Sequence, residues 1–221
     1  MAKDEFDFSD IDFTPFIRSS YFEKSIEELQ DDVKTNNRFA AYELGRRLKA
    51  KNELKTAYQY FSLSAELGDT DAPMEAALIA GGQERYQDAV YFLKMQIERT
   101  NDAKAHLLLG RYYASGKIGG IFKRNKFGFQ HFLAAAQQGH PEAQYLLALN
   151  YYEGRGTRHS LPDFTFWIRC AQLNGYQPAT YFMDRWLKTN AEYTRIWNDE
   201  IAKVEQQIMQ YPQYIPYYHR Q

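Results

Sequence analysis

The sequence is poor in cysteine, has no excess of either charge and contains no long apolar run. Its single cysteine, Cys170, cannot form an intramolecular disulfide, which excludes a small secreted fold stapled by disulfides. The 27 Lys and Arg residues are balanced by 28 Asp and Glu residues, so net charge does not favour nucleic acid or membrane as a partner. No stretch of about 18 apolar residues occurs, and residues 1–6 lack the basic and apolar regions of an export signal. We therefore expect a cytoplasmic chain with no membrane partner.

Motifs of catalysis and metal binding are missing as well. The histidines show no metal-ligand spacing, and no G-x-S-x-G motif is present. The glycine-rich segment 116–120 lacks the Walker spacing and a preceding strand, so it is interpreted as an inter-helix loop. Cys170 is in register with small core residues, and no motif places a His or Asn to activate it. We expect no enzyme activity, no cofactor and no metal site.

The chain does contain an internal repeat, which is the main signal in the sequence. The pattern Ala-x3-Leu-Gly-x2-Tyr-x2-Gly is complete once and recurs with substitutions, at 105–116, 143–154 and 40–51. Each copy is followed by a second pattern, which ends in glycine at Gly68, Gly139 or Gly175. A weaker copy, with a degenerate first part around residues 72–80, fills the gap and ends at Thr100.

The spacing within these patterns predicts helices. Residues at i, i+4 and i+8 lie on one helical face, so Ala105, Leu109 and Tyr113 form a stripe with a small residue where another helix approaches. Glycine directly after the second pattern is typical of a left-handed helix C-cap. An alanine that opens the next copy follows four residues after each of these glycines. The unit is therefore a helix-turn-helix repeated end to end.

These residues resemble the Sel-one-like repeat (SLR) family, a relative of the tetratricopeptide repeat. The resemblance covers roughly residues 38–188, and the junction Gln137–Ala143 is especially similar to that of the family. It implies an all-α, right-handed superhelical solenoid of about five repeats, which acts as a non-catalytic scaffold or adaptor for proteins. The chain departs from the family at two longer inter-helix segments, 117–126 and 155–162, and it lacks the cysteine pairs of secreted members.

The flanks of the array are predicted to close its ends. Ser20-x2-Glu23 matches a capping box, which predicts an N-terminal capping helix over 20–36, and 189–210 predict a C-terminal capping helix. Residues 1–19 form an acidic-aromatic arm, in which 4–13 could be an edge strand or an interaction arm, with disorder in isolation the plainer interpretation. The Tyr/Pro-rich tail 211–221 either docks into a partner or packs back on the last helix.

Binding is expected on the exposed face of the first helices of the repeats, which would line the concave groove. Counting from the Leu of each first helix gives a set rich in Tyr, Arg and Lys: Tyr42, Arg46, Lys49, Arg111, Tyr145, Tyr152, Tyr181, Arg185 and Lys188. Because Tyr and Arg are enriched at binding hot spots, we expect an acidic or aromatic-acidic peptide here, and residues 4–13 of the chain itself are a candidate. The alternative is that these positions are ordinary solvated faces.

Three functions remain open at this point. The leading one is a scaffold or adaptor that binds another protein in the groove. The second is an immunity protein or chaperone that inhibits or holds a toxin or secreted effector. The third, RNA binding by a helical-repeat protein, is disfavoured because the chain has no basic excess. The sequence does not identify the partner or the oligomeric state.

Overall fold

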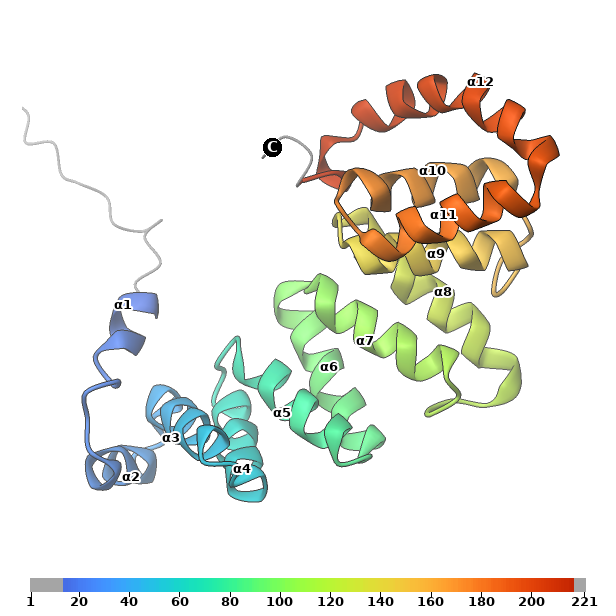
Figure 1. The fold of residues 1–221 in the computed structure, drawn as a ribbon. Helices are drawn as coiled ribbons and strands as arrows, with labels where there is room; N and C mark the ends of the chain where they lie inside the picture. The colour runs from blue at the N-terminus through green and yellow to red at the C-terminus, as the bar shows by residue number, and fades with distance from the viewer. Residues whose placement is uncertain (1–13, 217–221) are drawn as a thin grey trace, which may run out of the picture. The chain divides into compact units, whose positions relative to one another are not determined.

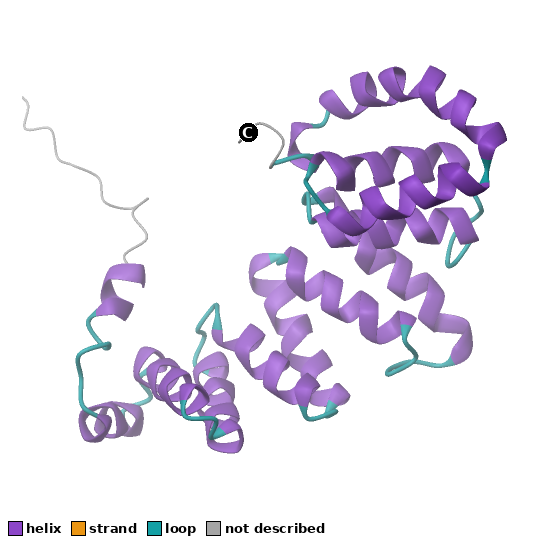
Figure 2. Ribbon diagram, in the orientation of Figure 1, coloured by secondary structure: helices purple, strands orange, loops and turns teal. Residues whose placement is uncertain are grey.

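The computed structural model describes residues 14–216, so the predictions made for residues 4–13 and for the last five residues of the tail lie outside the described part. The described residues form twelve α-helices and one 3-10 helix, with loops between them and no strand (Figures 1 and 2). The prediction of an all-α chain is confirmed. The chain divides into two compact units, and the boundary falls between Glu84 and Arg85.

The first unit contains a short helix followed by four longer ones. They are α1 (Thr14–Ser19), α2 (Ile26–Lys34), α3 (Arg38–Ala50), α4 (Leu54–Glu66) and α5 (Ala72–Gly82). Helices adjacent in the chain pack on one another, with α3 against α2 and α4, and α4 against α5.

The second unit contains seven α-helices and the 3-10 helix. They are α6 (Tyr86–Thr100), α7 (Ala103–Ala114), α8 (Ile121–Gln137), α9 (Pro141–Glu153), α10 (Leu161–Leu173), α11 (Gln177–Thr189), α12 (Ala191–Met209) and η1 (Pro212–Tyr214). Sequential packing continues here from α6 to α10, while α12 lies against both α10 and α11. Helices α3, α5, α7, α9 and α11 begin where the first helices of the repeats were predicted.

Helix α2 begins at Ile26, later than the start at residue 20 that the sequence predicts. Its N-cap is Ser25, whose hydroxyl accepts from the Glu28 amide at 3.1 Å while the Glu28 carboxylate accepts from the Ser25 amide at 2.6 Å. The predicted capping box at Ser20 and Glu23 is therefore wrong, because Ser20 instead donates its hydroxyl to the carbonyl of Ile17 at 2.7 Å. The chain contains two Ser-x2-Glu motifs, and the one followed by the apolar stripe begins the helix.

Helix α1, within the predicted arm, was not expected. Arg18 fastens it to the loop before α5 by an ion pair to the buried carboxylate of Asp69 at 2.5 Å and a second one to Asp71. The Arg18 guanidinium also lies over the ring of Tyr42, 4.3 Å from its centroid. Helix α1 is thus bound to the rest of the first unit by the ion pairs of Arg18 rather than by burial of apolar side chains.

The repeat glycine allows the two helices of a repeat to approach closely. A Cβ on Gly45 would lie 2.9 Å from the ring of Phe61, and a Cβ on Gly110 would lie 2.8 Å from the ring of Phe132. In the next repeat the equivalent pair is Ala148 and Ile168, both fully buried. The added methyl group in the first helix is thus accompanied by a smaller side chain in the second.

The glycines after the second helices have the predicted backbone conformation. Gly68, Gly139 and Gly175 have φ angles of 93°, 79° and 75°, in the left-handed region that glycine adopts without a Cβ clash. At Gly139 a Cβ would also lie 2.7 Å from the Gln213 carbonyl oxygen, so the chain's end packs directly on this turn.

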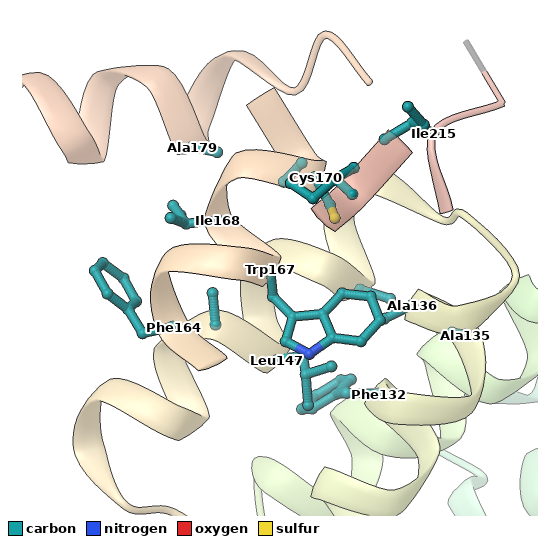
Figure 3. Close-up of a cluster of buried hydrophobic side chains, with 14 of the residues drawn as sticks. Phe132, Ala135, Ala136, Leu147, Phe164, Trp167, Ile168, Cys170, Ala179 and Ile215 are labelled. Atoms are coloured by element: carbon teal, nitrogen blue, oxygen red, sulfur yellow. The ribbon is translucent and has the colours of Figure 1, made fainter. Parts of the chain in front are cut away.

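The described part of the tail lies on the second unit. Gln144 and Asn174, both buried, donate side-chain amide hydrogens to the Tyr214 carbonyl at 2.5 and 2.7 Å. Ile215 follows with no exposed surface and belongs to the main hydrophobic cluster of this unit, together with Cys170 and Trp167 (Figure 3). The end of the described chain is thus packed into the core at Ile215 and half-buried at Tyr214, whereas residues 211–213 are exposed.

The two inter-helix segments are shorter than predicted. Helix α8 begins at Ile121, within the segment 117–126, so the loop ends at Gly120. Helix α10 begins at Leu161 after a Ser160 N-cap. The loop before it packs closely on α8 at Gly156, where a Cβ would lie 2.2 Å from the Asn125 carbonyl oxygen.

Candidate partner-binding surface

A hollow lies on the second unit between the first helices α9 and α11, with a volume of about 410 Å³. We call it the α9–α11 hollow, and it is lined by Tyr145, Pro178, Tyr181, Phe182, Arg185, Trp186 and Thr189. Three of these residues, Tyr145, Tyr181 and Arg185, belong to the set predicted from the repeat register. The structure therefore brings together predicted residues from two successive repeats.

Aromatic rings from both helices form the wall of the hollow. The Tyr145 ring lies 6.1 Å from the Phe182 ring in an edge-on arrangement and 5.5 Å from the Tyr176 ring. Burial raises the pKa of Tyr145, so its hydroxyl stays neutral and can donate or accept a hydrogen bond. Trp186 is only 9% exposed, and its indole N–H meets no acceptor among residues 14–216.

Tyr181 and Arg185 stand at the rim, one helical turn apart on α11. Tyr181 is 64% exposed. The Arg185 guanidinium lies 5.8 Å from the Tyr181 ring centroid, in cation–π range. Arg185 and Lys188 are both exposed, and neither forms an ion pair with another described residue. The rim therefore combines an exposed aromatic ring with the Arg185 cation, and Lys188 follows about one helical turn later on α11.

Tyr152 contributes to packing more than to the surface. Its ring lies within 5.3 Å of Phe164 and 6.0 Å of Trp186, centroid to centroid, and the residue is half-buried. Trp186 lines the hollow, so Tyr152 supports its wall through Trp186 without lining the hollow itself.

The cations predicted in the other repeats have partners within the chain. Arg46 and Arg47 both bind the fully buried carboxylate of Glu43 at 2.7 Å. Burial alone would raise the pKa of Glu43, but the hydrogen bonds from the two arginines outweigh it and lower that pKa. Arg111 reaches Glu142 of the next repeat at 3.2 Å.

In the first unit, Lys49 forms an ion pair with Glu75, and Tyr42 is half-buried against Phe61 and the Arg18 guanidinium. The predicted residues of this unit therefore already interact within the chain. Free cationic groups on the predicted face occur on α11, at Arg185 and Lys188.

A second hollow, not predicted from the sequence, lies between α10, α11 and α12. It has a volume of about 280 Å³ and is lined by Leu161, Pro162, Thr165, Trp186, Tyr193, Trp197, Glu200 and Val204. The signal was present in the sequence, since residues 193, 197, 200 and 204 follow one face of a helix. Its lining is almost wholly apolar, and a single carboxylate lies at its edge.

Among the described residues considered for chemistry, His106, His131 and Cys170 are all at least partly buried. His106 and His131 approach at 3.0 Å between their Nδ1 atoms, and burial lowers the pKa of both rings. Cys170 is buried, and burial raises the pKa of its thiol, so it is a poor nucleophile. Among the described residues, no group of three or more His, Cys, Asp or Glu side chains could hold a metal ion. No helix in residues 14–216 is long and apolar enough to cross a membrane.

Known structures resemble this arrangement of helices over most of its length. A protective antigen of uropathogenic Escherichia coli that displays an SLR fold matches 93% of this chain and 46% of its own, with a TM-score of 0.68 and 20% sequence identity. A Sel1 repeat protein from Oxalobacter formigenes matches 74% of this chain and 71% of its own, with a TM-score of 0.59 and 20% identity. The chain has the SLR fold. The resemblance first noted at residues 38–188 is confirmed at the level of the fold.

One curated protein is similar to part of this chain in sequence. The alginate biosynthesis protein AlgK of Azotobacter vinelandii is 31% identical over 128 residues, which cover 57% of this chain. The match covers 26% of AlgK, so the SLR chain spans about a quarter of the length of this relative. No protein-family model matches the chain.

Proposed function

We propose that this SLR protein is a non-catalytic scaffold that binds a segment of a partner protein on the face of its first helices, with the α9–α11 hollow as the anchoring site. The observation that carries the proposal is Tyr181, a large ring held 64% exposed at the rim of a hollow walled by aromatic side chains. Burial of an aromatic ring away from water is favourable, so a partner that covers the exposed Tyr181 ring would gain binding free energy.

The composition of the hollow supports a protein partner. Binding energy at protein interfaces concentrates in Tyr, Trp and Arg side chains that line central pockets, and all three types line this hollow. Its volume of about 410 Å³ is enough to admit one or two side chains of a bound segment. The hollow would therefore hold an anchor residue, while the rest of the segment follows the first-helix face.

The charge at the rim indicates the chemistry of the segment. Arg185 and Lys188 are exposed, so a carboxylate next to the anchor residue would gain an ion pair without displacing an existing one. An acidic segment with an aromatic or large apolar anchor fits both features. RNA is not proposed, because the chain's charge is balanced and a protein that contacts many phosphates needs a basic surface. A cytoplasmic location stays a prediction.

Selection from a displayed peptide library tests the proposal. We expect the full-length protein to enrich peptides that combine Asp or Glu with an aromatic residue. Tyr181→Ala combined with Arg185→Glu should weaken the best of them at least tenfold, since each hot-spot side chain is worth about 2 kcal/mol or more. The matched control is Tyr91→Ala combined with Arg158→Glu, which also removes an exposed Tyr and reverses an exposed Arg. Equal binding by both variants would place the partner site elsewhere.

A further inference from the structure

Two exposed aromatic side chains of the described chain lie far apart in the sequence. Phe16, in α1, is 79% exposed, and Tyr181, in α11, is 64% exposed. Phe16 lies three positions after Phe13, the last of the acidic-aromatic residues 4–13, and Ile17 beside it is 44% exposed. The start of the chain thus offers apolar and acidic groups, and α11 offers a ring beside free cations.

The residues 4–13 match the α9–α11 hollow in chemistry. They contain five carboxylates and three phenylalanines in near alternation, with Phe6 and Phe8 each next to acidic residues, and they contain no cation. A phenylalanine side chain fits among the rings of Tyr145 and Phe182, where edge-on packing is already the prevailing arrangement. The flanking carboxylates would face Arg185 and Lys188.

Binding by the same chain and binding by another copy have different consequences. If each copy binds one neighbour through its residues 4–13 and another neighbour through its hollow, the contacts are head-to-tail. Such contacts assemble copies into a closed ring or an open filament. Helix α1 follows residues 4–13 in the chain, and the ion pairs of Arg18 with Asp69 and Asp71 fix this helix to the first unit.

We propose that residues 4–13 of one copy occupy the α9–α11 hollow of a second copy, which gives the protein a head-to-tail self-association. The proposal rests on the proposed function, since it names the occupant of the same surface. Phe6 or Phe8 supplies the anchor, and the acidic residues beside it pair with Arg185 and Lys188. The association should weaken as salt is added, because ion pairs at an exposed rim are screened.

Complementation between two variants tests the head-to-tail geometry. One variant, Phe6→Ser with Phe8→Ser, keeps the hollow and loses the anchors; the other, Arg185→Glu with Tyr181→Ala, keeps the arm and loses the hollow. In sedimentation velocity, the wild type should grow in mass with concentration, and each variant should stay a monomer. Their mixture should form a one-to-one complex, because one intact arm then meets one intact hollow. A wild type that is monomeric at every concentration would overturn the proposal.

A synthetic peptide of residues 4–13 provides the second measurement. It is labelled at its N-terminus and titrated with the full-length Phe6→Ser, Phe8→Ser variant, whose own arm cannot compete. We expect saturable binding with a Kd on the order of 10–100 μM, at least tenfold weaker when Arg185→Glu is added. Tyr91→Ala with Arg158→Glu, added instead, should leave the affinity unchanged.

The two proposals fail separately. If the peptide does not bind but library peptides still depend on Tyr181 and Arg185, the self-association is wrong and the partner-binding function stands. If peptide binding is equal in every variant, the hollow is not the site for this segment. If the peptide binds and the wild type stays monomeric, the arm acts within its own copy, and the second-copy proposal is wrong.

Discussion

Replacing the repeat glycine Gly110 by alanine should destabilise the second unit, although glycine-to-alanine at a helical position with open space around it usually stabilises a protein. A Cβ at Gly110 would lie 2.8 Å from the Cδ1 and Cε1 atoms of Phe132 and 3.3 Å from the Gly128 carbonyl oxygen. Carbon atoms in contact prefer about 3.5–4.0 Å, so the Phe132 ring must move by roughly 0.7 Å. Phe132 is 3% exposed, and its neighbours leave little room for that movement.

The magnitude follows from two opposing effects. Alanine favours a helix interior over glycine by about 1 kcal/mol, while overpacking a dense core costs about 1–3 kcal/mol. We therefore expect Gly110→Ala to lower the free energy of unfolding by about 1 kcal/mol on balance. Gly82→Ala is the matched control, because a Cβ there meets nothing within 4 Å, and it should be neutral or slightly stabilising.

A double-mutant cycle isolates the contact. Phe132→Ile alone should cost about 1–3 kcal/mol through the space it leaves. In the Gly110→Ala background it should cost about 1–2 kcal/mol less, because alanine with isoleucine is the pair that the next repeat uses at Ala148 and Ile168.

The assay is urea unfolding followed by tryptophan fluorescence, which reports on the second unit because Trp167, Trp186 and Trp197 all lie in it. Far-UV circular dichroism follows Gly82→Ala, which lies in the first unit. Additive costs at Gly110 and Phe132, or a stabilising Gly110→Ala, would refute the packing argument.

Three further predictions concern other contacts. Burial and the nearby His106 and Lys94 lower the pKa of His131 to about 4. Below pH 6.5 the unfolded chain therefore binds a proton at this residue that the folded chain does not bind, so the free energy of unfolding should fall by about 1–2 kcal/mol as pH drops from 6.5 to 4. His131→Phe should flatten this dependence in unfolding measured across that window, and an unchanged slope would assign it to other groups. Ile215→Ala should cost about 2–4 kcal/mol by urea unfolding, against less than about 0.5 for the exposed Met209→Ala, and similar costs would mean that the tail does not pack as described. Ser25→Ala should cost about 1 kcal/mol by thermal melting while Ser20→Ala costs clearly less, and the reverse order would restore the capping box at Ser20.

The helices were predictable because their signals are local. The small-Leu-Gly spacing places Leu109 and Gly110 on one face, and a glycine after the second helix can adopt the left-handed turn at little cost. Which of the two Ser-x2-Glu motifs begins a helix depends on less local information. The helix begins at the motif followed by apolar residues that a neighbouring helix covers, and the full burial of Leu29 shows that this is the motif at Ser25.

Contacts between distant residues could not be read from the sequence. Arg18 with Asp69, and Gln144 and Asn174 with the Tyr214 carbonyl, join segments whose separation follows no repeat. The register predicted Tyr145, Tyr181 and Arg185 on one face, and the three residues line the α9–α11 hollow. It could not show that Arg111 is paired with Glu142 of the next repeat, since a charge pattern does not say which partners lie within reach.

The central claim is that the α9–α11 hollow anchors a partner segment, and amide hydrogen exchange on the full-length protein tests it most directly. Exchange is compared with and without a saturating acidic-aromatic peptide selected by the wild type. The account predicts slower exchange in α11 around Tyr181 and Arg185 and in α9 around Tyr145, with no such change when Tyr181→Ala and Arg185→Glu are introduced. Protection confined to other helices, such as α6 or α12, would contradict it.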